Sequence, residues 1–160
     1  MQYLREINVF TDGSFSRSSR GITCGYGIYF TKNEFPPVAA PFDLPNPTNQ
    51  RAELYAIYKG LKIVANSSNN YDIIKIYTDS MYSIQSLTKW IHEWKMNNWM
   101  TANKKPVKNT DIIIPIDDLI TNKKLNVKFI HVRAHTNLQD EFSIANDIVD
   151  KLAKLGGQKY

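Results

Sequence analysis

The sequence contains a single cysteine, Cys24, and has no long run of apolar residues. A disulfide or a zinc cluster needs several cysteines, and a transmembrane helix needs about 20 consecutive apolar residues. The first residues, MQYLREINVF, also lack the basic and then apolar pattern of a secretory signal. These absences argue against a membrane-spanning protein and against a secreted, disulfide-linked domain. They favour an intracellular location, cytoplasmic or nuclear, with no membrane partner.

The rest of the composition is that of an ordinary globular chain. Its 160 residues are 42% hydrophobic and 22% charged, which suits one domain over residues 1–160 that folds without a metal or a disulfide. Lysine and arginine together number 20 against 15 acids, a net charge of +5. This charge favours an anionic partner, but only weakly.

Hydrophobic periodicity predicts three closely linked strands, followed by strands that alternate with helices. Strands are expected from Ile7, over 25–30, within the proline-rich stretch 35–47, over 73–77 and over 125–132. Helices are expected from a cap at Thr48 or Asn49 to Asn66, over 80–98 as one or two segments, over 111–119 with Pro115 near the first turn, and finally up to a stop at Gly156. This order predicts a mixed sheet covered by helices.

Two of these strands run directly into an acidic residue. The first leads into TDGS at 11–14, and the strand over 73–77 leads into Thr78 and Asp79. The ends of strands in an open α/β sheet form the edge where such sheets bind ligands, so Asp12 and Asp79 are candidate site residues. Asp-Gly and Asp-Ser are also common turn and cap sequences, and either acid alone fits that alternative.

Two further candidate acids lie on predicted helices. Glu53 is one turn into the first long helix, where a carboxylate also suits a helix N-terminus. Asp150 lies beside the apolar stripe of the last helix, whereas Asp147 fits an ordinary first-turn acid. Hard oxygen ligands without cysteine suit Mg²⁺ or Mn²⁺. The spacing of the four acids does not show that they meet.

Seven motifs, in one order, make the chain similar to type 1 ribonuclease H, the family that cuts the RNA strand of RNA–DNA hybrids. They are TDGS (11–14), TNQRAEL (48–54), YTDSMY (77–82), WIHEWKMNNW (90–99), KKPVKN (104–109), HVRAH (131–135) and NDIVDKLA (146–153). Each is weak alone, but each falls on the expected element. The resemblance implies an α/β ribonuclease H-like fold in a stand-alone domain, with a five-stranded mixed sheet, helices on both faces and a basic protrusion.

The resemblance also implies a two-metal site. The family's four carboxylates match Asp12, Glu53, Asp79 and Asp150, and the family histidine near the metals matches His135. Because four adjacent carboxylates repel one another, we expect activity to depend on two Mg²⁺ ions, with Mn²⁺ possible. The expected products carry 5′-phosphate and 3′-hydroxyl ends. The segment from His135 to Asp150 is longer than in many members, which leaves the role of His135 open.

A surface for the RNA–DNA hybrid is implied in the same way. Residues 89–109 hold five lysines against one acid, together with all three tryptophans, although a core stripe with a solvated basic face would look similar. In the family such a protrusion grips DNA phosphates, two residues hold one further phosphate, and two read the groove near the cut. The matching residues here are Trp90, Trp94, Lys104, Lys105 and Lys108 for the protrusion, Thr48 and Asn109 for the phosphate, and Asn49 and Gln50 for the groove.

The sequence leaves three functions to compare. They are an endoribonuclease acting on hybrids, a module that binds hybrids without cutting them, and a resolvase or proofreading exonuclease on the same fold. All four carboxylates are present, which favours an enzyme, and the sequence Asp12-Gly13-Ser14 lacks the D-x-E pattern of the exonucleases. We therefore predict a hydrolase that is a monomer and has no obligatory protein partner.

Overall fold

The computed structural model describes residues 3–133 and 140–160, which form a five-stranded mixed sheet in the order β3-β2-β1-β4-β5. β1 pairs antiparallel with β2 and parallel with β4, β2 pairs antiparallel with β3, and β4 pairs parallel with β5. The strands are β1 (Glu6–Ser18), β2 (Gly21–Phe30), β3 (Val38–Pro41), β4 (Ile73–Thr78) and β5 (Val127–His131). The predicted mixed sheet is confirmed, with the proline-flanked strand at its edge.

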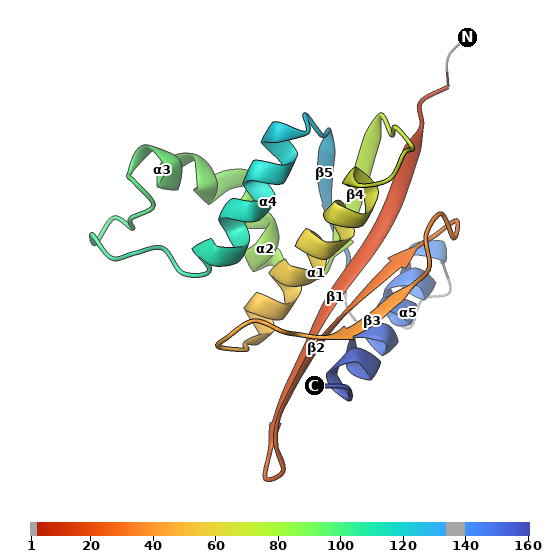
Figure 1. The fold of residues 1–160 in the computed structure, drawn as a ribbon, viewed down its shortest axis with the longest axis horizontal. Coiled ribbons are helices and arrows are strands. Elements are labelled where there is room, and N and C mark those ends of the chain that lie inside the picture. The colour runs from red at the N-terminus through yellow and green to blue at the C-terminus, as the bar shows by residue number, and fades with distance from the viewer. Residues whose placement is uncertain (1–2, 134–139) are drawn as a thin grey trace.

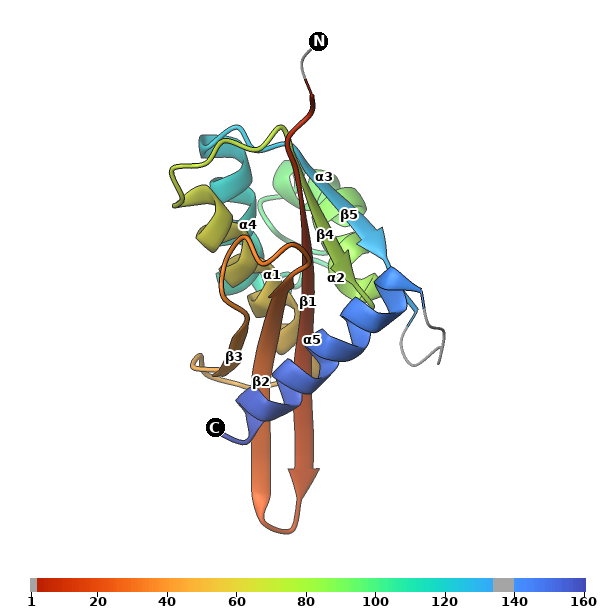
Figure 2. The ribbon, with the colours of Figure 1, turned by 90° about the vertical axis from the view of Figure 1, so that its right-hand side faces the viewer.

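Helices cover both faces of this sheet, as predicted (Figures 1 and 2). On one face α1 (Asn49–Ala65) packs on β1 and β2, with α4 (Thr110–Asn122) against it. On the other face α5 (Glu141–Gly157) crosses β1, β2 and β3. Between β4 and α4 the chain forms α2 (Met81–Gln85), the π-helical turn η1 (Ser86–Trp90) and α3 (Ile91–Met96). None of the helices in the described residues is long and apolar enough to cross a membrane.

Strand alternation divides the apolar residues between two cores. Successive side chains of a strand point to opposite faces, so Val9 packs in the larger core with α1 and α4. Its neighbour Phe10 faces the other way and packs with Tyr77 of β4 and Val149 of α5. Thr48 caps α1 by accepting a hydrogen bond from the backbone N–H of Arg51, as one of the two predicted caps.

Glycines let α5 lie unusually close to the sheet. A Cβ on Gly27 would lie 2.7 Å from the backbone nitrogen of Ala153, and one on Gly156 would clash with the backbone of Ala40 in β3. The prediction that Gly156 ends the last helix is wrong, because the helix continues to Gly157 and the φ of Gly156 is not positive. Gly156 is needed for close packing on β3, not for a left-handed helix stop.

Pro115 also differs from its predicted place. α4 begins at Thr110, so this proline is its sixth residue and lies beyond the first turn. An interior proline costs a helix about 3 kcal/mol. Ile112, Ile113 and Ile116 are buried in the larger core, and each such side chain contributes roughly 1.5–3 kcal/mol. Their burial outweighs the cost of the proline, so the helix continues past it to Asn122.

Candidate active site

Three of the four candidate acids meet where the parallel pairing of β1 with β4 ends. The last such pair is Phe10 and Tyr77, and Asp79 directly follows β4. Asp12 lies in the middle of β1, which continues to Ser18 instead of ending at TDGS as predicted, because it stays paired with β2. Glu53 reaches the same point from the first turns of α1. One carboxylate oxygen from each of the three acids lies within 4.8 Å of those of the other two. The structure thus brings together residues separated by 41 and 26 positions in the sequence.

Gly13 allows Glu53 to approach this closely. A Cβ on Gly13 would lie 2.5 Å from the backbone nitrogen of Glu53 and 2.6 Å from the carbonyl carbon of Ala52, closer than real Cβ contacts. The absence of a side chain therefore lets the backbone of α1 rest on β1. The backbone N–H of Gly13 also donates a 3.0 Å hydrogen bond to Asp12 Oδ1, which orients that carboxylate.

Burial makes this cluster costly while it is fully ionised. Asp12 is 5% exposed and Glu53 is 4% exposed. Burial, together with the charges of Asp79 and Asp150, raises the pKa of Asp12 to about 7. Burial, and then the charge of Asp12, raises the pKa of Glu53 well above its ordinary value.

One buried carboxylate oxygen of the cluster indicates that a cation stabilises the ionised acids. Glu53 Oε2 is buried and has no hydrogen-bond partner among the described residues. An unpartnered carboxylate oxygen is strongly disfavoured in a buried site unless a cation neutralises it. Three carboxylates that converge on one point, with no sulfur or nitrogen ligand among them, fit a hard divalent cation such as Mg²⁺ or Mn²⁺.

Asp150 lies beside the three-acid cluster without being part of it. Its charge contributes to the raised pKa of Asp12, so its carboxylate is near that residue. The carboxylate also forms a 3.0 Å ion pair with Lys154, one turn along α5. Asp147, the alternative on the same helix, is exposed. The geometry therefore favours Asp150 as the fourth acid, on the opposite side of Asp12 from α1.

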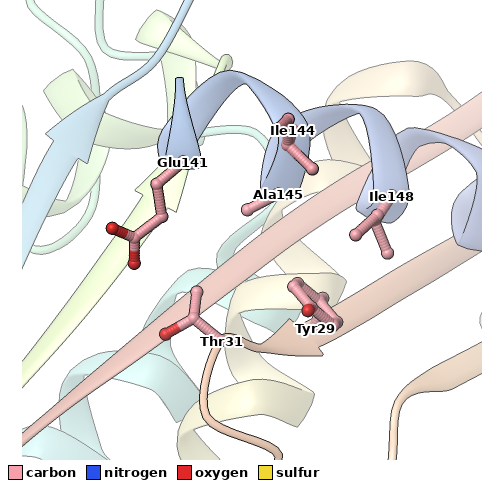
Figure 3. A pocket seen from close by; sticks show the side chains of 6 residues that line it. All are labelled: Tyr29, Thr31, Glu141, Ile144, Ala145 and Ile148. Carbon is pink, nitrogen blue, oxygen red and sulfur yellow. The ribbon is translucent and has the colours of Figure 1, made fainter. Parts of the chain in front are cut away.

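The four acids are not part of the apolar pocket on the α5 face. That pocket has a volume of about 320 Å³ and contains none of the four acids (Figure 3). It lies between the end of β2 and the first half of α5, and its lining is Tyr29, Thr31, Glu141, Ile144, Ala145 and Ile148.

Comparisons with known proteins agree with this arrangement. The family model described as RNase H matches residues 5–158. The chain belongs to the RNase H family. It is 35% identical over 152 residues to Ribonuclease H of Schizosaccharomyces pombe. The matched region covers 94% of this chain and 53% of the Schizosaccharomyces pombe protein. It is 34% identical over 154 residues to Ribonuclease HI of Haemophilus ducreyi, covering 96% of this chain and 91% of that one.

A solved structure of the family has the same fold. The solution structure of the PFV RNase H domain is 26% identical and superposes with a TM-score of 0.79, covering 98% of this chain and 97% of that domain. The family and the α/β fold predicted from the seven motifs are thereby confirmed. The predicted basic protrusion, the single-domain organisation and the individual site roles stay predictions. His135, the family histidine, lies outside the described residues.

The residues expected to hold a DNA phosphate in the RNase H family lie at the adjoining N-termini of α1 and α4. Thr48, Asn49 and Gln50 are exposed at the start of α1. Asn109 precedes α4 in the left-handed conformation, with φ of 65°. Its side-chain nitrogen donates a 2.8 Å hydrogen bond to the hydroxyl of Tyr82, and its oxygen accepts one of 3.3 Å from Arg51.

Arg51 joins these two helix ends, and it was not among the site residues predicted from the sequence. It is 7% exposed and donates bonds of 2.8 and 2.7 Å to the two carboxylate oxygens of Asp111. Hydrogen bonding to Asp111 raises the pKa of Arg51, and the same pairing lowers the pKa of Asp111. The only sequence signal was a cation inside TNQRAEL, since the 60-residue separation from Asp111 carries no periodic pattern.

The tryptophans form a ladder on the α3 side of the molecule. The Trp90 and Trp94 ring centroids are 6.0 Å apart, those of Trp94 and Trp99 are 6.4 Å apart, and Tyr82 contacts Trp90 at 6.2 Å. All three indoles are half-buried, and Trp94 and Trp99 pack against the larger core. The ladder thus supports α3 and the segment that follows it, which extend away from the sheet in Figure 1.

The lysines of this segment are free to meet a partner. Lys104, Lys105 and Lys108 are exposed, whereas Lys95 forms a 2.6 Å ion pair with Asp117 of α4. The segment is held in shape by a backbone bond from Thr101 to the carbonyl of Lys105 and by a bridge between Met100 and Pro106. The tryptophans therefore combine the two alternatives of the sequence analysis, a partly packed stripe that carries an exposed basic loop.

Proposed function

We propose that this protein is an endoribonuclease that hydrolyses the RNA strand of RNA–DNA hybrids and leaves 5′-phosphate and 3′-hydroxyl ends. The observation that carries the proposal is the convergence of Asp12, Glu53 and Asp79, two of them buried, with the unpartnered Glu53 Oε2 among them. Membership of the RNase H family supports the reaction. The chain spans about half of the Schizosaccharomyces pombe protein.

Two Mg²⁺ ions, or Mn²⁺ in their place, are the proposed cofactors. Asp12, Glu53 and Asp79 would hold one ion, and Asp12 and Asp150 would hold the other. When bound, the ions supply a nucleophilic water of lowered pKa and neutralise the leaving 3′ oxygen. Asp12 is the residue suited to be shared, because it belongs to the cluster with Glu53 and Asp79 and also interacts with Asp150.

The chain's own residues have three tasks in this reaction. The backbone N–H of Gly13 holds the carboxylate of Asp12 in one orientation. The low exposure of Asp12 and Glu53 removes water that would weaken their hold on a cation. His135 is proposed to move a proton or to help the product leave, as the family resemblance implies.

The substrate would lie across the N-termini of α1 and α4. In this proposal Thr48 and Asn109 hold a DNA phosphate, and Asn49 and Gln50 read the groove near the cut. The α1 N-terminus adds free backbone N–H groups and a positive dipole end, which favour an anion. Beyond them, Lys104, Lys105 and Lys108 pair with phosphates, and Trp90 and Trp94 pack on sugars. The protein works as a monomer in an intracellular compartment.

End-labelled duplexes test the proposal directly. RNA–DNA hybrid, RNA–RNA, DNA–DNA and single-stranded RNA are incubated with the protein in Mg²⁺ and in EDTA. We expect cleavage of RNA in the hybrid alone, and its loss in EDTA. Asp79→Asn should abolish cleavage and spare hybrid binding, while the exposed Asp147→Asn should cleave like the wild type. Hybrid binding without any cleavage in Mg²⁺ or Mn²⁺ would replace the enzyme with a binding module.

A further inference from the structure

The hairpin of β1 and β2 extends beyond the neighbouring strand β3 and the covering helix α5. β3 pairs with β2 only as far as Gly25, and α5 ends at Gly157, which packs against that same glycine. Beyond this point β1 and β2 pair only with each other, up to Ser18 and Gly21. Residues 16–23 are all exposed, and Figures 1 and 2 show the ribbon projecting from the body of the molecule. We call residues 16–23 the β1–β2 arm.

Folding stability does not account for this arm. A two-stranded ribbon without a packed face is marginally stable in water, and none of the arm's side chains is buried. Unpaired sheet edges are also a risk for association. We therefore expect this projecting hairpin to have a binding role.

The chemistry of the arm is cationic and rich in hydroxyl groups. Its sequence, SRSSRGIT, holds two arginines and four hydroxyl side chains. The chain has no acidic residue between Asp12 and Glu34. Neither Arg17 nor Arg20 forms an ion pair with any residue in the described parts of the chain. Guanidinium groups bind phosphate through two parallel hydrogen bonds, and serine and threonine hydroxyls donate to phosphate oxygens.

The arm lies at the same end of the sheet as the proposed substrate surface. α1 runs antiparallel to β1, because Glu53 lies over Gly13 while Gly60 lies over Val9. The exposed N-terminus of α1 therefore points toward the arm. Alternation places Arg17 on the strand face of Gly13, the face that α1 covers. Arg17 is five residues beyond Asp12, which at the rise of a strand is about 17 Å, or half a turn of a duplex.

We propose that the β1–β2 arm is a second phosphate-binding element for the hybrid, about half a helical turn from the cut. The proposal rests on the proposed function, because it takes the hybrid as the bound duplex. Arg17 and Arg20 pair with the phosphate backbone, and the neighbouring hydroxyls add neutral hydrogen bonds. The hybrid is then held on both sides of the carboxylates, by the arm on one side and by the lysines of residues 104–108 on the other.

The test compares two double variants that each remove two positive charges. R17A/R20A changes the arm, and K32A/K123A changes two exposed lysines at the opposite end of the sheet, after β2 and after α4. Binding of a labelled 20-base-pair hybrid is measured by fluorescence anisotropy in EDTA over a range of salt concentrations, so the measurement does not depend on cleavage. R17K/R20K keeps the charge and serves as the rescue.

We expect R17A/R20A to flatten the plot of log affinity against log salt by about 1–2, and K32A/K123A to leave it near the wild type. R17K/R20K should restore most of the slope. On an eight-base-pair hybrid, too short to reach the arm from a central cut site, R17A/R20A should match the wild type. Equal slopes for R17A/R20A and the wild type on the long hybrid would overturn the proposal. Failure of the proposed function would show separately, as a wild type that binds hybrid and does not cut it in Mg²⁺.

Discussion

The guanidinium of Arg51 and the carboxylate of Asp111 form a two-bond ion pair that joins the first turn of α1 to the first turn of α4. The bonds measure 2.8 and 2.7 Å, and the same guanidinium donates to the side chain of Asn109 at 3.3 Å. Thr48 is tied to Arg51 as well, through the 3.0 Å bond from the Arg51 backbone N–H. Both residues proposed to hold the DNA phosphate are therefore bonded to Arg51, Thr48 to its backbone N–H and Asn109 to its buried guanidinium.

Arg51→Lys should weaken both the fold and hybrid binding. An ammonium cannot make two parallel bonds to Asp111 and also reach Asn109, because it lacks the planar fork of a guanidinium. We expect a loss of roughly 1–2 kcal/mol in the free energy of unfolding, measured by urea denaturation. Hybrid affinity should fall by less in an Asn109→Ala background than in the wild type. The exposed Arg5→Lys is the control, and additive effects of the two changes would contradict the link to Asn109.

Gly13→Ala should damage the acidic cluster from within the sheet. The added Cβ would lie 2.5 Å from the Glu53 backbone, so α1 must shift away from β1. We expect a cost of roughly 1–3 kcal/mol in stability and, since a displacement of about 1 Å can reduce a rate 10²-fold, a comparable loss in hybrid cleavage.

Gly60→Ala is the matched control. Whereas Gly13 lies in β1 and faces α1, Gly60 lies in α1 and faces β1. There the nearest atom to a Cβ is Val9 Cγ1, at 3.4 Å, and alanine favours a helix over glycine by about 1 kcal/mol. Cleavage should be unchanged and stability should stay within about 1 kcal/mol of the wild type. Similar losses for both variants would show that the approach at Gly13 is not special.

The metal-free protein should lose stability as the pH rises from 4 to 8. Asp12 has a pKa of about 7 in the fold against roughly 3.9 when unfolded, so the folded state binds more protons between these values. The stabilisation is complete below the lower value and disappears as the pH passes the upper one, an effect of up to about 4 kcal/mol. Thermal unfolding in EDTA across this range measures it.

One variant and one ligand test whether the acidic cluster causes this pH dependence of stability. Asp12→Asn should flatten the pH dependence, because the amide does not ionise. Mg²⁺ should raise the unfolding temperature of the wild type at pH 8, since a ligand that binds only the folded state stabilises it. Stability that rises between pH 5 and pH 8 in EDTA would contradict the burial of ionising groups at this site.

Replacing Lys104, Lys105 and Lys108 with alanine should weaken hybrid binding and reduce its salt dependence. Each lost phosphate contact removes about 0.9 from the slope, so the triple variant should lose up to about 3. The control removes three exposed lysines elsewhere, Lys32, Lys62 and Lys123. If both triple variants bind with the same slope, the loop does not contact phosphate.

Local sequence was sufficient where the determining interactions are local. The junction of β4 with Asp79, the Thr48 cap and the alternating strands could be predicted because each depends on neighbouring residues. The predicted end of the first strand at TDGS is wrong, because β1 stays paired with β2 through Asp12 as far as Ser18. The end of α5 and the place of Pro115 could not be predicted in this way. Gly156 contacts the backbone of Ala40, and the isoleucines around Pro115 are buried against α1, so distant segments decide both.

The sequence by itself determined the order of strands and helices, the chemical type of the four acids and, through seven motifs, the family. Only the tertiary structure decided which acids share one site, because residues 41 and 26 positions apart meet through strand pairing and the missing side chain of Gly13. It also decided that Arg51 is buried against Asp111 and that the β1–β2 arm has no cover. Burial and ion pairing depend on distant segments that folding brings together. The periodicity of the sequence therefore cannot predict them.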